Sequence, residues 1–221
     1  MQQEKKIKGF TLLELLVTLT IVSIISGISF PKFIQWKKDR EVRQAVEKAA
    51  SMLTSVITHS SRGSYPYVQI EFKSNSSLTS ITTKGMSKST LSDNLNQKKQ
   101  AINCPITTQG TIYWDADPIE TKSFPVGSSA GSGGAICFSR EGTYYDLVGS
   151  ELILNNQDAN KQALGGFNVS QYIIFCSTDI AQNGVCPRKL AKKDKPAYLL
   201  EWSRFGNVVK YKWNGVNWYR Q

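Results

Sequence analysis

The sequence predicts an α+β protein in which a long, kinked N-terminal helix, transmembrane in its first half, packs on an antiparallel β-sheet. Three observations predict this class. Residues Phe10 to Phe30 form an apolar run whose only charge is Glu14. Apolar residues then recur at steps of three and four, and beyond Gly63 they alternate with polar residues. These are the periods of a membrane helix, an amphipathic helix and half-buried strands.

The apolar run is long enough to cross a membrane. Its 21 residues would extend about 31 Å as a helix, close to the thickness of a hydrocarbon core. Lys5, Lys6 and Lys8 precede it, and because positive flanking charge stays cytoplasmic, we expect the N-terminus inside and the bulk of the chain outside. A cleaved secretory signal is the alternative, but its apolar core is shorter and rarely holds a carboxylate.

An amphipathic stripe continues the helix beyond the apolar run. The stripe consists of Val42, Ala45, Val46, Ala49, Leu53, Val56 and Ile57. We predict one helix from about Thr11 to Ser60, with a kink near Pro31 because proline lacks a backbone donor and clashes with the preceding turn. Arg62-Gly63-Ser64 is expected to end it.

Alternating residues after the helix predict strands. Val68, Ile70 and Phe72 alternate with polar residues in VQIEFK, as in a strand with one buried face. The other candidates are SLTSITT, GTIYWD, GAICFS, GTYYDLVG, SELILN, SQYIIFCS, AYLLEWS, NVVKYKWN and VNWYR. Two stretches, Ser87 to Gln100 and Pro125 to Gly134, are predicted to be loops, the second flexible by composition.

All four cysteines, Cys104, Cys137, Cys176 and Cys186, follow the membrane segment. An even number in an oxidising compartment indicates disulfides. Three connectivities are possible; Cys176 and Cys186 could close a short loop, which would leave Cys104 with Cys137. The spacing matches no zinc pattern and His59 is the only histidine, so no metal site and no cofactor are expected.

Positive charge is concentrated near the C-terminus. The chain carries a formal charge of +10, and from Cys186 onward nine basic and two acidic residues give +7. Such asymmetry suggests an anionic partner or a solvated basic face.

The stretch KGFTLLELLVTLTIVSIISGISFPKF resembles the class III leader and helix start of type IV pilins and type II secretion pseudopilins. The resemblance covers about residues 5 to 40. It implies that a membrane peptidase cleaves after Gly9 and methylates Phe10. Residues 1–9 would then be a leader, 10–30 a transmembrane and assembly helix, 31–62 its amphipathic second half, and 63–221 a periplasmic or extracellular β-rich domain.

The same resemblance gives Glu14 a role. A charge inside a bilayer costs several kcal/mol unless it is paired. Cleavage would create an α-amine on Phe10, and the resemblance implies that Glu14 of one subunit meets this amine on a neighbour and so sets the stagger of subunits in a fibre. Alternatively, Glu14 only favours the helix N-terminus electrostatically.

A weaker resemblance concerns the C-terminal half. ICFSREGTYYDLV and LLEWSRFGNVVKYKW are similar to the strand–Gly–strand pattern of H-type pseudopilins and FimT-like minor pilins, some of which bind DNA through a basic Gly-Arg-x-Arg stretch. That stretch is missing here. Basic residues remain among aromatic ones, and the candidates for DNA binding are Arg188, Lys189, Lys192, Lys193, Lys195, Lys210 and Lys212. The alternative, which we favour, is that the aromatics are core positions and the lysines a solvated face.

No arrangement of residues suggests catalysis. We therefore predict a non-enzymatic minor pilin or pseudopilin of the FimT or H-type group, inserted in the inner membrane before it enters a pilus or pseudopilus. Its partners would be other pilins, the prepilin peptidase and an inner-membrane assembly platform. The alternatives are a DNA-capturing tip pilin for DNA uptake and an anchored periplasmic protein unrelated to any fibre.

Overall fold

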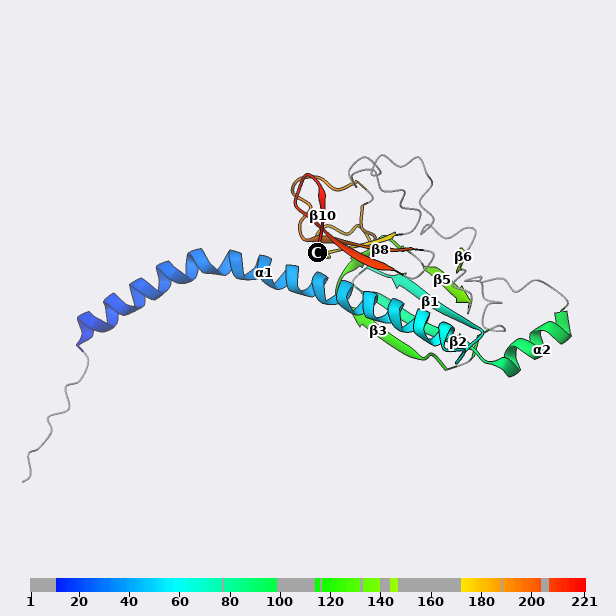
Figure 1. Cartoon of the computed structure of the whole chain (residues 1–221). Coiled ribbons are helices and arrows are strands. Elements are labelled where there is room, and N and C mark those ends of the chain that lie inside the picture. The colour runs from blue at the N-terminus through cyan, green and yellow to red at the C-terminus, as the bar shows by residue number, and fades with distance from the viewer. Residues whose placement is uncertain are drawn as a thin grey trace, which may run out of the picture. The chain divides into compact units, whose positions relative to one another are not determined.

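The computed structural model of the chain describes residues 11–76, 78–98, 114–115, 117–131, 133–139, 144–146, 172–187, 189–203 and 207–221. Helix α1 (Leu12–Ser61) is followed by strands and one further helix, α2 (Lys88–Lys98) (Figure 1). The strands are β1 (Tyr67–Ser74), β2 (Thr79–Met86), β3 (Glu120–Phe124), β4 (Gly127–Ser128), β5 (Gly134–Ser139), β6 (Tyr144–Asp146), β7 (Tyr172–Cys176), β8 (Ala197–Trp202), β9 (Val208–Trp213) and β10 (Trp218–Arg220). The chain divides into two units, Met1–Lys37 and Lys38–Gln221.

The predicted long helix and the α+β class are confirmed. Helix α1 spans 50 residues and ends in a Schellman motif around Gly63. The Ser64 amide donates to the His59 carbonyl (3.1 Å) and the Gly63 amide to the Ser60 carbonyl (3.0 Å). Gly63 has a φ of 72°, a left-handed conformation that suits glycine at this position.

The strands form two antiparallel sheets, where the sequence predicted one. The first sheet has the order β3-β2-β1-β5-β6 and the second the order β10-β9-β8-β7-β4. In each sheet, strands that follow one another closely in the chain pair as neighbours: β1 with β2, and β7, β8, β9 and β10 in succession. Strand β5 returns to the free side of β1.

One core joins the second half of α1 to both sheets. The helix contributes Val42, Ala45, Val46, Ala49, Met52, Leu53 and Val56, each at most 1% exposed. The first sheet adds Val68, Ile70, Phe72, Ile81, Ile136 and Phe138, and the second adds Ile173, Phe175, Tyr198, Leu200 and Trp202. The period-two residues of VQIEFK therefore face the helix, as their alternation predicts.

The central strands of the second sheet are buried on both faces. Ile173 and Phe175 face the helix. Tyr172, Ile174 and Cys176 belong to a second cluster on the other face, together with Leu199, Tyr211 and Trp213. The strand β7 reads YIIFC and is buried throughout, which is the continuous apolar pattern of a strand covered on both sides.

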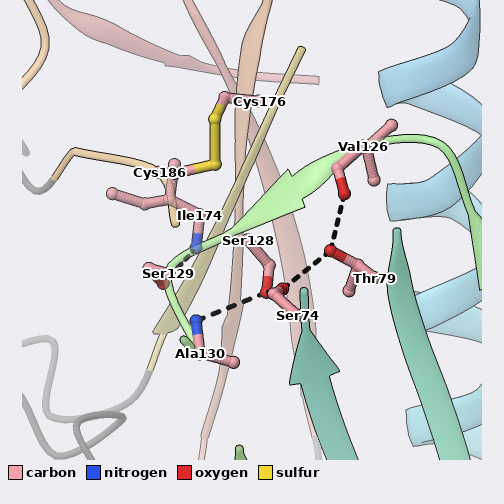
Figure 2. The surroundings of a disulfide bond; sticks show 9 residues. All are labelled: Ser74, Thr79, Val126, Ser128, Ser129, Ala130, Ile174, Cys176 and Cys186. Carbon is pink, nitrogen blue, oxygen red and sulfur yellow. Dashed lines mark hydrogen bonds between the residues drawn. A yellow bond between two sulfur atoms is a disulfide. The ribbon is translucent and has the colours of Figure 1, made fainter. Parts of the chain in front are cut away.

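Buried hydroxyl groups connect the two sheets at one end (Figure 2). Ser74 Oγ, at the end of β1, lies 2.8 Å from Thr79 Oγ1 of β2 and 2.5 Å from Ser128 Oγ of β4. Thr79 donates to the Val126 carbonyl (2.7 Å), and the Ile174 amide of β7 donates to Ser129 Oγ (3.0 Å). Each of these hydroxyls therefore has a hydrogen-bond partner where the sheets meet, as buried polar groups require.

Both predicted loops were wrong in part. Within Ser87 to Gln100 the structure has α2, which begins because Ser87 Oγ accepts from the Thr90 amide (3.2 Å) as an N-cap. Within Pro125 to Gly134, β4 and Val126 are buried rather than flexible, since this stretch crosses the junction between the sheets.

Other strand predictions need correction as well. The strand β3 (ETKSF) was not predicted, because three of its residues are exposed and it carries no apolar alternation. In GTIYWD, residues 110–113 lie outside the described residues, and Trp114 and Asp115 are not in a strand. The SELILN segment also lies outside the described residues.

Gly184 provides a test of how closely the sheets are joined. A Cβ at Gly184 would lie 1.7 Å from the Asn75 carbonyl oxygen, and its φ is 81°. We expect Gly184→Ala to lower the free energy of unfolding by about 2–5 kcal/mol, because left-handed strain and overpacking add. The measurement is urea unfolding of the purified chain in detergent.

Gly63→Ala is the matched control, since Gly63 also has positive φ but nothing within 4 Å of its Cβ position. Gly63→Ala should lower the free energy of unfolding by only about 1–2 kcal/mol, the cost of the left-handed backbone conformation. Equal losses in the two variants would contradict the close approach at Gly184.

Candidate assembly site on the N-terminal helix

The first half of α1 exposes its apolar side chains. Exposed are Leu12, Leu13, Leu15, Leu16, Val17, Leu19, Ile21, Val22, Ile24 and Ile25, from 44% for Val17 to 84% for Leu12. A continuous apolar surface of this size on a soluble protein marks a membrane or protein contact. It is the surface that a lipid-embedded or fibre-forming helix would present.

The polar side chains of this segment bond within the helix. Thr18 donates to the Leu15 carbonyl (2.9 Å), Thr20 to the Val17 carbonyl (2.8 Å) and Ser23 to the Leu19 carbonyl (2.8 Å). Such back-bonding satisfies hydroxyl groups where no water is present. The segment can therefore carry these residues into an apolar environment.

Helix α1 bends near the end of the apolar run. Among the residues that the structure describes, no unbroken helix is long and apolar enough to span a membrane. The pair Leu12–Gly27 and Ser29–Ser61, bent by 40°, meets that test by length and composition. Pro31 explains the position of the bend, because its missing N–H leaves the Gly27 carbonyl without its helical donor. The bend thus lies just before the proline, where the sequence placed the kink.

Thr11 and Glu14 form the start of the helix. Thr11 Oγ1 accepts from the Glu14 amide at 3.2 Å, the N-cap arrangement. The spacing T-x-x-E is that of a capping box. A carboxylate in the first turn also interacts favourably with the positive end of the helix dipole. Sequence reasoning missed the cap at Thr11, although this spacing signals it.

The charge of Glu14 has no counterpart within the described part of the chain. No cation lies within ion-pair distance of its carboxylate there. The predicted cleavage residues Gly9 and Phe10 lie outside the described residues. The pairing of Glu14 with a terminal amine accordingly stays a prediction.

Ion pairs connect the second half of α1 to the strands and loops around it. Lys48 contacts Glu120 of β3 (2.7 Å), and Glu47 contacts Lys210 of β9 (2.5 Å). Lys38 pairs with Asp179, in the turn after β7. Each such partly exposed pair contributes little alone, but together they fix the helix on both sheets.

Asp39 organises the most buried of these polar contacts. Lys212 Nζ lies 2.9 Å from Asp39 Oδ1, and the Tyr198 hydroxyl donates to the same oxygen at 3.1 Å. Lys212 Nζ also lies 5.3 Å from the centre of the Tyr198 ring, within cation–π range.

The pKa values of these groups reflect the arrangement. Burial would lower the pKa of Lys212, but the hydrogen bonds with Asp39 and Tyr198 outweigh it and raise that pKa. Burial raises the pKa of Tyr198, and Asp39 adds to this although Lys212 opposes it. Both groups therefore hold their protons more firmly in the folded protein.

The predicted DNA-binding residues fall into two sets. Lys210 and Lys212 form ion pairs with carboxylates of α1, so their charges are already neutralised within the protein. Lys189, Lys192, Lys193 and Lys195 are exposed on the segment between Cys186 and β8, and no acidic group of the described residues pairs with them. Arg188 lies outside the described residues.

The C-terminal aromatic residues serve mainly as core. Trp202, Tyr211 and Trp213 are at most 6% exposed. Trp213 also donates from Nε1 to the Ala191 carbonyl (3.1 Å), so it fixes the lysine-bearing segment on the second sheet. This favours the interpretation of these aromatics as core positions over a base-stacking role.

Of the disulfide pairings left open by the sequence, the structure contains Cys176–Cys186 (Figure 2). Cys137 is also disulfide-bonded, and Cys104 lies outside the described residues. In the described segments, no group of three or more His, Cys, Asp or Glu side chains could hold a metal ion.

Comparison with known proteins identifies the N-terminal motif. Residues 5–30 match the family model of the prokaryotic N-terminal methylation motif. No curated protein and no solved structure matches the chain. The motif supports a pilin-like structural subunit that a prepilin peptidase processes and that assembles with other pilins.

The Asp39 cluster predicts a loss of stability at alkaline pH. A raised folded-state pKa means that the native state binds more protons than the unfolded state. Stability from Lys212 is therefore present below its unfolded pKa of about 10.4 and lost as pH rises through the folded value. Tyr198 acts in the same direction. We expect the melting temperature of the chain in detergent, followed by circular dichroism, to fall above about pH 10.

Lys212→Met should melt lower at neutral pH and show a shallower alkaline decline. Lys193→Met is the matched control, because Lys193 is exposed and lacks an acidic partner among the described residues. Identical alkaline profiles for the two variants would refute the role of the cluster.

Proposed function

We propose that the chain is a minor pilin or pseudopilin subunit of a type IV pilus or a type II secretion-like filament. In this proposal a peptidase cleaves after Gly9 and methylates Phe10, and the subunit then assembles through its N-terminal helix. The observation that carries the proposal is that the methylation motif at residues 5–30 leads into a helix whose apolar side chains are exposed on all sides. The resemblance of the C-terminal strands to FimT-like and H-type subunits supports that group.

The domain plan follows the same proposal. Residues 1–9 are the leader, 10–30 the membrane and assembly helix, 31–62 its amphipathic half and 63–221 the external domain. Basic residues flank the apolar run on both sides, with Lys32, Lys37 and Arg40 after it, so charge alone is weak support for orientation. The Cys176–Cys186 disulfide is stronger support, since disulfides persist outside the cytoplasm.

Glu14 gives the assembly step its specificity. In a bilayer the carboxylate is costly unless paired, and the described part of the chain offers it no cation. A cleaved neighbour supplies one in its α-amine at Phe10. Bundling of helices then buries apolar surface and pairs the two charges, which sets the axial register of the subunits.

The proposal predicts the N-terminus of the processed protein and an assembly defect in a Glu14 variant. Protein extracted from membranes of cells with the peptidase should have an intact mass that begins at Phe10 and includes one methyl group. Glu14→Gln should insert and be cleaved, because a neutral side chain enters lipid more easily, yet its amount in sheared filaments should fall strongly relative to wild type. The measurements are mass spectrometry and immunoblotting of the filament fraction.

Asp117→Asn is the matched control, because Asp117 is an exposed carboxylate in the second unit. It should enter filaments normally. An uncleaved Met1 terminus in the presence of the peptidase would refute the pilin assignment, and normal incorporation of Glu14→Gln would refute the pairing.

A second candidate function, DNA capture by a tip subunit during DNA uptake, draws on the lysine-bearing segment. Lys189, Lys192, Lys193 and Lys195 lie within seven residues, exposed and without acidic partners in the described segments. Trp213 and the Cys176–Cys186 disulfide hold the two sides of this segment. Lysines presented on a fixed segment can bind phosphates without sequence preference. This candidate excludes Lys210 and Lys212, which pair with Glu47 and Asp39, respectively.

Charge reversal tests the second candidate. Lys192→Glu combined with Lys193→Glu should weaken binding of duplex DNA by the detergent-solubilised chain and reduce the slope of log K against log salt by about two. Lys88→Glu with Lys122→Glu changes the net charge equally at two exposed lysines elsewhere and should keep most of the binding. Equal effects of the two pairs, measured by fluorescence anisotropy, would exclude the segment as the binding site.

A further inference from the structure

Aromatic and basic side chains follow the apolar run of α1. Phe30, Phe33 and Trp36 are 66%, 59% and 55% exposed, and Lys32 is exposed beside them. We propose that these four residues form a membrane-interface belt that contacts phospholipid headgroups on the outer side and sets the depth of the helix. The inference rests on the membrane-anchored state in the proposed function. The methylation motif ends at residue 30, so it includes Phe30 but not Lys32, Phe33 or Trp36.

The position of the belt along the helix fits headgroup depth. The run from Phe10 to Phe30 already fills a hydrocarbon core of about 30 Å. Trp36 lies six residues beyond Phe30, or about 9 Å along a helix axis, which places it at the aqueous edge of a headgroup layer about 5–8 Å deep. Phe33 lies between them, at the boundary.

The chemistry of the belt fits the same layer. Phe33 and Trp36 form a ring pair with centroids 5.8 Å apart, and Lys32 precedes Trp36 by one helical turn. Indole rings combine an apolar body with a polar N–H and are enriched at membrane interfaces. A lysine at the end of an apolar run can extend its amine to lipid phosphates.

A phospholipid surface suits these residues better than the apolar face of another helix. An apolar helix–helix contact would bury Lys32 without a carboxylate, which is unfavourable. At a headgroup layer the same amine meets phosphate, and the partly exposed aromatic rings need not be fully desolvated. The charged residues that follow, from Lys37 onward, then lie on the aqueous side.

Depth-dependent quenching of tryptophan fluorescence tests the proposal. The full chain is reconstituted in phosphatidylcholine vesicles with or without phosphatidylglycerol, and the lipids carry bromine either near the headgroup or near the chain end. The difference between wild type and Trp36→Phe isolates Trp36. Trp218→Phe is the matched control, because Trp218 belongs to β10 and its ring packs at a tilt against Trp213.

We expect shallow bromines to quench Trp36 more strongly than deep ones, and this excess to disappear in Trp36→Phe but persist in Trp218→Phe. In Lys32→Gln, the gain in shallow quenching on adding phosphatidylglycerol should be lost. Three results would overturn the proposal. Deep bromines could quench Trp36 more strongly than shallow ones, or neither could quench it. Quenching of Trp36 that weakens as the ratio of protein to lipid rises would instead show that a second copy of the chain covers this residue. The vesicle experiment needs no peptidase and no filament. If Trp36 is quenched as expected but the chain is never cleaved at Gly9, the proposed function is refuted and the membrane-interface belt is not.

Discussion

Burial of one stripe of α1 is the interaction on which the compact unit depends. Val42, Val46, Met52, Leu53 and Val56 are almost completely inaccessible to solvent, and each contributes about 1.5–3 kcal/mol by removal from water. The stripe fills a single core with the inner faces of both sheets. The two sheets also meet directly, through the Phe72–Phe175 ring pair and the hydroxyl cluster around Ser128, but the helix side chains cover the inner faces of both. The helix therefore acts as the shared layer of the domain.

In the proposed function the same helix has to suit two solvents. Up to Phe30 its apolar side chains are exposed, and its threonine and serine hydroxyls bond to its own carbonyls. From Lys38 onward it carries charges that pair with both sheets: Lys38, Asp39, Glu47 and Lys48. The change from internal hydroxyl bonding to ion pairing follows the change in surroundings that the sequence predicts. A continuous helix can do this because its backbone groups are satisfied in either medium.

Much of this architecture could be predicted from the sequence, since local periodicity specifies each element. The helix, its glycine end and most described strands follow from spacing alone. The division into two sheets could not be predicted, because it depends on β4 and the buried Ser128, in a stretch whose composition is that of a linker. In β9 the alternation correctly separates Tyr211 and Trp213 from Lys210 and Lys212. It could not reveal that the lysines face Asp39 and Glu47, which are more than 160 residues away.

The two interpretations of Glu14 are compatible once the helix start is considered. Thr11 caps the helix by accepting the Glu14 amide, so the cap itself uses the backbone of Glu14 and leaves its charge available. Cleavage after Gly9 would place a positive amine one residue before this cap, at the positive end of the helix dipole, where a cation is unfavourable. Methylation would leave that charge in place. A carboxylate in the first turn offsets this unfavourable interaction. In lipid the two charges need each other more, because neither is hydrated there. Helix capping and subunit pairing would thus use different atoms of one residue, and only the pairing requires that a neighbour be present.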